Sequence, residues 1–272
     1  MIKLPVQKVS TSVSTESIDI LASEEPLEIR LEYGAADQRI QKTISITMRT
    51  PGNDKELAAG FLFTEGVIQS KNEIDDLPKK KDAGENVLII SIKPAVNFNL
   101  VKLERHFYTS SSCGVCGKTS IEAIKTVCRL PNIKNDVQYP ASLIHQLPEK
   151  LRSNQMVFEQ TGGLHASALF NKDGDLILIK EDVGRHNALD KLIGAAMLAG
   201  MLPLHDHILL LSGRISFELI QKAAMAGIKI VTAVGAPSSL AVETAASFDM
   251  TLIGFLRDKR FNIYSGAQRI VI

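Results

Sequence analysis

The sequence predicts an α/β protein, α+β overall, in which a small N-terminal α+β unit precedes an α/β layer with a largely parallel sheet. Residues 27–48 alternate apolar and polar side chains, a pattern typical of a half-buried hairpin. From about Gln155 onward, short apolar strands alternate with helical segments, as they do where helices connect parallel strands. With 272 residues and 45% hydrophobic content, the chain is long enough for two modest domains or one large one.

The N-terminal unit combines a hairpin, a helix and a further strand. Residues 34–37 separate the two halves of the hairpin. Asn53 is placed to cap a helix whose apolar positions are Leu57, Ala58, Phe61 and Leu62. A polar stretch then leads to a strand over residues 87–92. Together these elements predict a small α+β unit in the first hundred residues.

The second half repeats a strand-then-helix pattern. Strands are expected over residues 177–179, 208–211, 228–234 and 250–255. Helices are expected to begin at Asn187, Ser216 and Ser238. This alternation is the basis for predicting an α/β layer.

The charge balance excludes one class of partner. Lys and Arg number 31 against 30 Asp and Glu, a formal net charge of +1, so no global field is expected to attract DNA or RNA. The first residues lack the apolar run of a secretion signal, and no apolar run approaches the roughly 20 residues that span a bilayer. We therefore expect a cytoplasmic protein without a membrane segment.

Two of the three cysteines, Cys113 and Cys116, form a CGVC pair that we expect to be reactive. A capping box from Thr119 to Glu122 predicts a helix directly after them. The positive end of a helix favours a thiolate, and an exposed nucleophilic cysteine, with an ordinary pKa of roughly 8.5, needs such help. The pattern also fits a redox-silent pair or half of a zinc site.

The alternatives to a nucleophilic cysteine are weakened by the surrounding sequence. A zinc site needs two more ligands, yet Cys128 falls on the apolar face of the predicted helix, as a buried core thiol does. Thioredoxin-like CxxC pairs follow a core strand, whereas residues 107–112 form a serine-rich loop. Dithiol exchange remains open but is less favoured.

Three glycine-bearing loops in the second half have the pattern of anion sites. Residues 181–187 place Arg185 at the start of a helix, where backbone N–H groups attract phosphate. Residues 212–214, with Arg214, and residues 235–239, with Ser238, each follow a strand. Ligands of open α/β sheets bind at the carboxyl ends of strands, so we expect these loops to converge with Arg257, Lys259 and Arg260 into one basic crevice suited to pyrophosphate.

His165 lies in a sequence, H-A-S, that only partly matches the zinc deaminases. Their signature is H-x-E followed by P-C-x-x-C, whereas here Ser167 replaces the glutamate and no cysteine follows. His165 is therefore expected to be a structural histidine or a substrate contact, and no metal site is predicted.

Several separate motifs make the chain resemble the FdhD family of formate dehydrogenase accessory sulfurtransferases over nearly its whole length. In chain order they read TPGNDKELAAGFLFTEGVI, SSSCGVCGK, TGGLHASAL, EDVGRHNALDKLIG, SGRISFE and FLRDKRFNIYSGAQRI. Their number and order make this resemblance far more specific than the CxxC pair alone.

The resemblance implies a sulfur relay. A cysteine desulfurase would load Cys113 with sulfane sulfur as a persulfide, with Cys116 as its CxxC partner. The acceptor would be the molybdenum or tungsten bis-guanine-dinucleotide cofactor, that is, bis(molybdopterin guanine dinucleotide), destined for the formate dehydrogenase apo-enzyme, and GDP would mimic part of it. The family's cofactor-binding segment matches Phe255, Leu256, Arg257, Asp258, Lys259 and Arg260. Arg185, Arg214 and Ser238 are added from their spacing rather than from the resemblance.

The resemblance also implies an architecture. Residues 1–105 would form the N-terminal α+β domain, and residues 106–272 a cytidine-deaminase-like three-layer α/β domain without the deaminase zinc site, with the CxxC loop (110–118) near the junction. The family suggests a homodimer. Two rival functions stay open: a non-catalytic chaperone that binds the cofactor, and a dithiol oxidoreductase in which Cys113 and Cys116 cycle to a disulfide.

Overall fold

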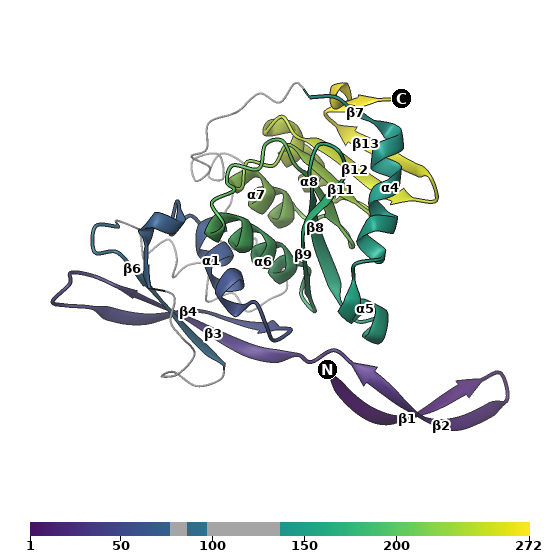
Figure 1. The fold of residues 1–272 in the computed structure, drawn as a ribbon, viewed down its shortest axis with the longest axis horizontal. Helices are drawn as coiled ribbons and strands as arrows, with labels where there is room; N and C mark the ends of the chain where they lie inside the picture. Colours follow the sequence, from purple (N-terminus) through teal and green to yellow (C-terminus); the bar gives the residue numbers. More distant parts are fainter. Residues whose placement is uncertain (77–85, 97–136) are drawn as a thin grey trace.

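The computed structural model describes residues 1–76, 86–96 and 137–272, and Figure 1 shows their arrangement. Within these ranges the chain forms an N-terminal two-stranded ribbon, a four-stranded sheet, a six-stranded sheet and a small two-stranded pair. Helices pack on both larger sheets, so the mixed α/β class is confirmed. In the described part of the chain, no helix combines the length and the apolar character needed to cross a membrane.

The four-stranded sheet belongs to the N-terminal unit and has the order β4-β3-β6-β5. The predicted hairpin is confirmed: β3 (Glu25–Tyr33) and β4 (Ile40–Arg49) are antiparallel, and Leu27, Ile29 and Leu31 alternate into the core. The predicted third strand is β6 (Val87–Ile92), parallel to β3, and the short β5 (Ile74–Asp76) completes the edge after a 3₁₀ turn, η1 (Lys71–Glu73).

The predicted helix after Asn53 is confirmed as α1 (Asp54–Thr64), which covers this sheet, but its start differs from the expectation. Asn53 occupies the N-cap position, yet its side chain makes no capping bond to the backbone. Its φ of 57° is left-handed, and its amide donates to Glu56 Oε1 at 3.4 Å instead. Asparagine tolerates that backbone conformation better than most residues, which explains its presence there.

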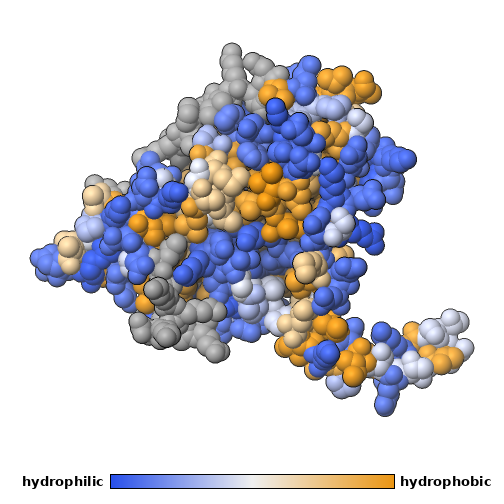
Figure 2. Space-filling model, in the orientation of Figure 1, coloured by the Kyte–Doolittle hydropathy of each residue, from blue (hydrophilic) through white to orange (hydrophobic). Residues whose placement is uncertain are grey.

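The first 21 residues form a ribbon that the sequence pattern did not predict. Strands β1 (Ile2–Ser10) and β2 (Val13–Leu21) pair along their whole length, and the ribbon extends away from the body (Figure 1). Large apolar side chains on it stay exposed, including Val9 at 74% and Ile18 at 67%. Figure 2 shows apolar residues along this arm. The ribbon therefore adds little to the core.

The six-stranded sheet of the second half has the order β13-β12-β11-β10-β8-β9. Its strands are β8 (His165–Phe170), β9 (Leu176–Asp182), β10 (Ile208–Leu211), β11 (Ile230–Ala233), β12 (Thr251–Arg257) and β13 (Arg260–Ser265). Only β10–β11 and β11–β12 pair in parallel; β8–β9, β8–β10 and β12–β13 are antiparallel. The prediction of a largely parallel sheet is therefore wrong. Strands β8 and β13 were missed, and the turns that join β8 to β9 and β12 to β13 are too short for a helical crossover.

Helices cover both faces of this sheet. On one face, Leu169 and Leu209 pack in a cluster with α6 (Arg185–Leu198), α7 (Phe217–Met225) and α8 (Ser239–Ser247). On the other, Ala168 and Leu210 pack against α4 (Ala141–Arg152). The remaining elements are α5 (Met156–Thr161), the turn η2 (Ala267–Arg269), and the paired strands β7 (Tyr139–Pro140) and β14 (Ile270–Val271).

The two halves meet where α1 crosses α6, and glycines allow the crossing. A Cβ on Gly60 would lie 1.9 Å from the carbonyl oxygen of Asp190, and a Cβ on Gly194 would lie 1.9 Å from that of Glu56. The backbones of the helices are therefore in contact, with no room for a side chain at either position. One hydrophobic cluster runs continuously from β3 through α1 to α6 and α7.

Candidate functional site

The cysteine site lies outside the described residues. Cys113, Cys116 and Cys128, the CxxC loop (110–118) and the border predicted between residues 105 and 106 all fall within residues 97–136. The persulfide role of Cys113, the partner role of Cys116 and the core position of Cys128 therefore stay predictions.

The predicted loops lie at the same end of the six-stranded sheet, where β10, β11 and β12 terminate. This end of the sheet is called the site edge below. Strands β10, β11 and β12 run in the same direction, so their carboxyl ends share that edge. The loop after β10 and the loop after β11 are hydrogen-bonded to each other: Ile215 N–H donates to the Ala236 carbonyl at 3.0 Å, and Ser238 N–H to the Ile215 carbonyl at 3.0 Å. The predicted approach of these two loops is confirmed, and the basic crevice suited to pyrophosphate stays a prediction.

Glycines let these loops approach so closely. A Cβ on Gly235 would lie 2.8 Å from the carbonyl oxygen of Gly213, and one on Gly254 would lie 2.9 Å from Pro237 Cδ. The chain therefore uses small residues at consecutive strand ends to bring three segments together. A larger residue at Gly235 or Gly254 would push these segments apart.

The segment from Phe255 to Arg260 forms a tight hairpin turn at the same edge. Arg257 and Arg260 are cross-strand partners, and the residues between them, Asp258 and Lys259, have φ values of 52° and 55°. Positive φ at both central residues is the geometry of a type I′ turn, whose twist matches that of the flanking strands. All four side chains are exposed. The turn thus presents three basic residues and one acidic residue to solvent.

Phe255 and Leu256 anchor that turn to the rest of the sheet. Leu256 is 1% exposed and packs in the cluster formed with α4. Phe255 N–H donates to the Gly235 carbonyl at 3.0 Å, which ties β12 to the loop after β11. Their contribution to a ligand site is therefore to fix the position of the basic turn.

Arg185, Arg214 and Ser238 were added to the predicted site from their spacing. The side chains of Arg185 and Arg214 are available to bind a ligand, whereas the Ser238 hydroxyl already makes a hydrogen bond. Arg185 begins α6, and its Nε is buried without a hydrogen-bond partner among the described residues. Arg214 is exposed in the loop after β10. Ser238 is exposed, but its hydroxyl caps α8 by accepting from Ala241 N–H at 3.2 Å.

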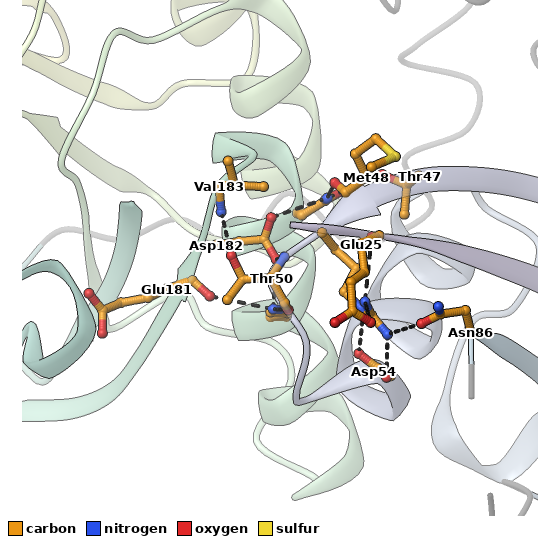
Figure 3. Close-up of polar contacts among 12 residues, drawn as sticks. Glu25, Thr47, Met48, Thr50, Asp54, Asn86, Glu181, Asp182 and Val183 are labelled. Atoms are coloured by element: carbon orange, nitrogen blue, oxygen red, sulfur yellow. Dashed lines mark hydrogen bonds and ion pairs between the residues drawn. The ribbon is translucent and has the colours of Figure 1, made fainter. Parts of the chain in front are cut away.

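The start of α6 is anchored by a buried carboxylate that the sequence analysis missed (Figure 3). Asp182 is fully buried; its Oδ2 lies 2.6 Å from Lys191 Nζ and accepts from Thr50 N–H at 3.1 Å. Its Oδ1 accepts from Gly184 N–H at 2.8 Å. Thr50 follows β4, so this contact binds the N-terminal unit to the helix that carries Arg185. An acidic residue two positions before a glycine was the only sequence signal.

His165 lies at this edge, at the start of β8. A Cβ on Gly213 would lie 3.1 Å from its Nδ1, so the imidazole packs directly on the loop after β10. Burial lowers the pKa of His165, and the neighbouring positive charge of Arg185 lowers it further. Within the described ranges, no group of three or more His, Cys, Asp and Glu side chains is placed to hold a metal ion.

His186, in the first turn of α6, contacts α7. Its Nε2 lies 3.1 Å from Ser216 Oγ and 3.5 Å from Glu218 Oε2, and burial lowers its pKa to about 4. The three residue types match a hydrolytic triad, but both oxygens face the same imidazole nitrogen. A triad needs the carboxylate on the opposite nitrogen, so this arrangement does not have the geometry of a triad.

Behind His186 lies a buried cation. The side chain of Lys222 is 2% exposed; its Nζ lies 3.0 Å from Asp190 Oδ2 and donates to Thr64 Oγ1 at 3.0 Å. The three surrounding carboxylates, Asp190 first, raise the pKa of Lys222 above its ordinary value despite burial. This group joins α1, α6 and α7 directly beneath the site edge.

Comparison with known proteins identifies relatives across nearly the whole chain. The model of the FdhD/NarQ family matches residues 22–271. The chain is 48% identical over 268 residues to the sulfur carrier protein FdhD of Streptomyces coelicolor, covering 96% of this chain and 92% of that protein. It is 40% identical over 263 residues to the sulfur carrier protein FdhD of Saccharolobus solfataricus, covering 97% and 95%.

A solved structure is similar in fold. The crystal structure of a formate dehydrogenase accessory protein from Desulfotalea psychrophila aligns with a TM-score of 0.76, 24% identity and 99% coverage of both chains. At that identity the likeness concerns the fold, including the mixed α/β arrangement described above.

Proposed function

Because the chain belongs to the FdhD/NarQ family, we propose that it is a sulfur carrier for formate dehydrogenase that holds sulfur as a persulfide on Cys113 and passes it to a bis-guanine-dinucleotide cofactor. The observation that carries the sulfur-carrier function is the 48% identity over 96% of the chain to a protein named for that role. The CGVC pair supplies the thiol that such a carrier requires.

The proposed loading step is a thiolate attack on a persulfide. The Cys113 thiolate attacks the outer sulfur of the donor's persulfide, a new S–S bond forms, the donor S–S bond breaks, and the donor leaves as a thiolate. A cysteine desulfurase is the proposed donor. Cys116 is proposed to tune the persulfide or to resolve it.

The proposed acceptor is anionic, and the site edge has the chemistry to meet it. A bis-guanine-dinucleotide cofactor of molybdenum or tungsten, bis(molybdopterin guanine dinucleotide), carries several phosphate charges, and here it is cargo. Arg257, Lys259 and Arg260 are exposed on the turn, and the buried Nε of Arg185 has no partner among the described residues. Guanidinium groups bind phosphate through charge-assisted hydrogen bonds, which supports a phosphate ligand at this edge.

Further proposals concern assembly and ancestry. We propose that the chain works in the cytoplasm, forms a homodimer and delivers its cofactor to the formate dehydrogenase apo-enzyme. We also propose that the second half is related to the cytidine deaminases without their zinc site. Support comes from the β9-β8-β10-β11-β12 order with helices on both faces, and from Ser167 in the place of the deaminase glutamate.

Mass spectrometry after incubation with a cysteine desulfurase and cysteine tests the carrier function. Wild type, Cys113→Ala and Cys116→Ala are compared by intact mass and peptide mapping. One added sulfur on Cys113 is expected, lost in Cys113→Ala. No adduct while the desulfurase itself is loaded would favour the chaperone function, and a Cys113–Cys116 disulfide alone would favour dithiol exchange.

A further inference from the structure

His186 and Glu218 connect the starts of two helices at the site edge. His186 is the second residue of α6, and Glu218 is the second residue of α7. Imidazole Nε2 lies 3.1 Å from the hydroxyl of Ser216, the N-cap residue of α7, and 3.5 Å from Glu218 Oε2. Two oxygens from α7 therefore surround one nitrogen of the ring.

Glu218 also reaches the buried cation. Its other oxygen, Oε1, lies 3.9 Å from Lys222 Nζ, one turn further along α7. Lys222 is held by Asp190 at 3.0 Å and by Glu65 at 3.6 Å, so its ammonium is fixed in place. Glu218 thus stands between a fixed positive charge and the imidazole.

This arrangement favours a proton on the imidazole nitrogen that faces Glu218, which is Nε2. A carboxylate only accepts hydrogen bonds, and an unprotonated Nε2 would direct its lone pair toward that negative charge at 3.5 Å. The ring is neutral near pH 7, because burial lowers its pKa to about 4 even though the neighbouring Glu218 carboxylate favours the charged form. A neutral ring has one N–H, so a proton on Nε2 leaves Nδ1 as an acceptor.

We propose that Glu218 is a positioning residue that fixes His186 as the Nε2–H tautomer, so that Nδ1 accepts a hydrogen bond from a hydroxyl or N–H group of the bound nucleotide. This inference rests on the proposed cofactor function. The His186 side chain is 25% exposed, which leaves part of the ring open to a ligand. Arg185, its neighbour in the chain, supplies donors for phosphate. The acceptor Nδ1 of His186 and the cationic donors of Arg185 together suit a ligand that carries both phosphate groups and the hydroxyl or N–H donors of ribose or guanine.

The tautomer is measured first, by long-range ¹H–¹⁵N NMR of the histidine rings. The chain has six histidines, and the His186 signals are assigned by their loss in His186→Gln. We expect an Nε2–H pattern in the wild type and a shift toward Nδ1–H in Glu218→Ala, where Ser216 O–H is free to donate to Nε2. An Nδ1–H pattern in the wild type, or no change in Glu218→Ala, would overturn the proposal.

The ligand contact is then tested by binding of GDP and of inorganic pyrophosphate to the full chain. Pyrophosphate brings the charges without the nucleoside donors. We expect Glu218→Ala and His186→Gln each to weaken GDP binding roughly fivefold, as for one lost hydrogen bond, and the double variant to lose no more than either. Pyrophosphate binding should stay unchanged. Glu243→Ala, on the exposed side of α8, is the matched control and should bind both ligands as the wild type does.

The two possible failures are distinguishable. Equal losses for GDP and pyrophosphate would mean that Glu218 only orients the arginines, and the acceptor role of His186 would be wrong. No GDP binding by the wild type would overturn the cofactor proposal and with it the nucleotide contact, while the NMR pattern would still decide the tautomer.

Discussion

The α1–α6 crossing and the β12–β13 turn both contain basic residues, but in opposite settings. Beside the crossing, Lys222 of α7 is 2% exposed and is matched by carboxylates and a hydroxyl from α1, α6 and α7. At the turn, Arg257, Lys259 and Arg260 are exposed, and within the described ranges none of them forms a salt bridge.

The difference shows that the chain uses separate sets of basic residues for folding stability and for ligand binding. A buried charge must be paired, because an unpaired one costs several kcal/mol, so the environment of Lys222 is closed to ligands. Exposed charges add little to stability, so the turn is free to serve recognition. Changes at the crossing should therefore lower the free energy of unfolding, and changes at the turn should leave that free energy nearly unchanged but weaken binding.

The largest effect is expected for Gly194→Ala. The new methyl group would meet the Glu56 carbonyl at 1.9 Å, and a backbone atom in a helix cannot move aside, so α1 and α6 must separate. We expect a loss of about 3 kcal/mol or more in urea unfolding, at the upper end of overpacking. Gly163→Ala is the control, since its Cβ would meet only the Thr161 carbonyl at 3.8 Å. Equal stability of the two variants would refute the close crossing.

Replacing the buried cation should come next. Lys222→Met leaves Asp190 buried without its partner, for which we expect a loss of about 3 kcal/mol. The double variant Lys222→Met/Asp190→Leu should recover much of that loss, because no unpaired charge remains. Chemical unfolding of both variants checks this. A double variant as unstable as the single one would show that packing, rather than charge pairing, dominates at the crossing.

His186 should make stability depend on pH. Its folded pKa of about 4 lies below the ordinary 6.5, so between these values the unfolded chain binds more protons. The contribution is fully present above pH 6.5 and is lost as the pH falls to 4, by up to about 3 kcal/mol at 1.36 per unit. His186→Gln should flatten this part of the unfolding profile. The difference should persist in high salt, because burial causes it; a difference that disappears in salt would point to surface charges instead.

The basic turn should have the smallest effect on stability. Arg257→Gln and Arg260→Gln should each change the unfolding free energy by less than about 0.5 kcal/mol. Each should weaken GDP binding by roughly tenfold at low salt and reduce its salt dependence, as expected for phosphate contacts. Lys172→Gln is the control, because it is equally exposed in the turn between β8 and β9 at the opposite edge of the sheet. Similar losses of affinity in all three variants would exclude a specific role for the turn.

Sequence patterns predicted the site edge better than the sheet that carries it. The loops containing Arg185, Arg214 and Ser238 were identifiable because glycine and serine after an apolar strand have a local signature. Strand β8 was missed because residues 166–170 are buried on both faces and do not alternate. The ribbon of β1 and β2 was missed because its apolar residues face solvent.

The residues that bind the two halves together had almost no readable signal, apart from the acidic residue two positions before a glycine at Asp182. Asp182 meets Thr50, and Lys222 meets Thr64, over more than a hundred positions of sequence. Such contacts follow from how α1 lies on α6, which no local pattern encodes. In the sequence, Gly60 and Gly194 can be interpreted only as residues that destabilise a helix. Their role at the crossing becomes visible only when the backbone atoms that they contact in the other helix are known.

The glycine crossing also limits how the chain can change over evolutionary time. Every other amino acid has a Cβ, so neither Gly60 nor Gly194 can be exchanged while the other half keeps its backbone in place. A recombinant that joins one half of this chain to the other half of a distant relative would succeed only if both glycine positions and the crossing geometry arrived together. We therefore expect the two halves to be exchangeable only as a pair.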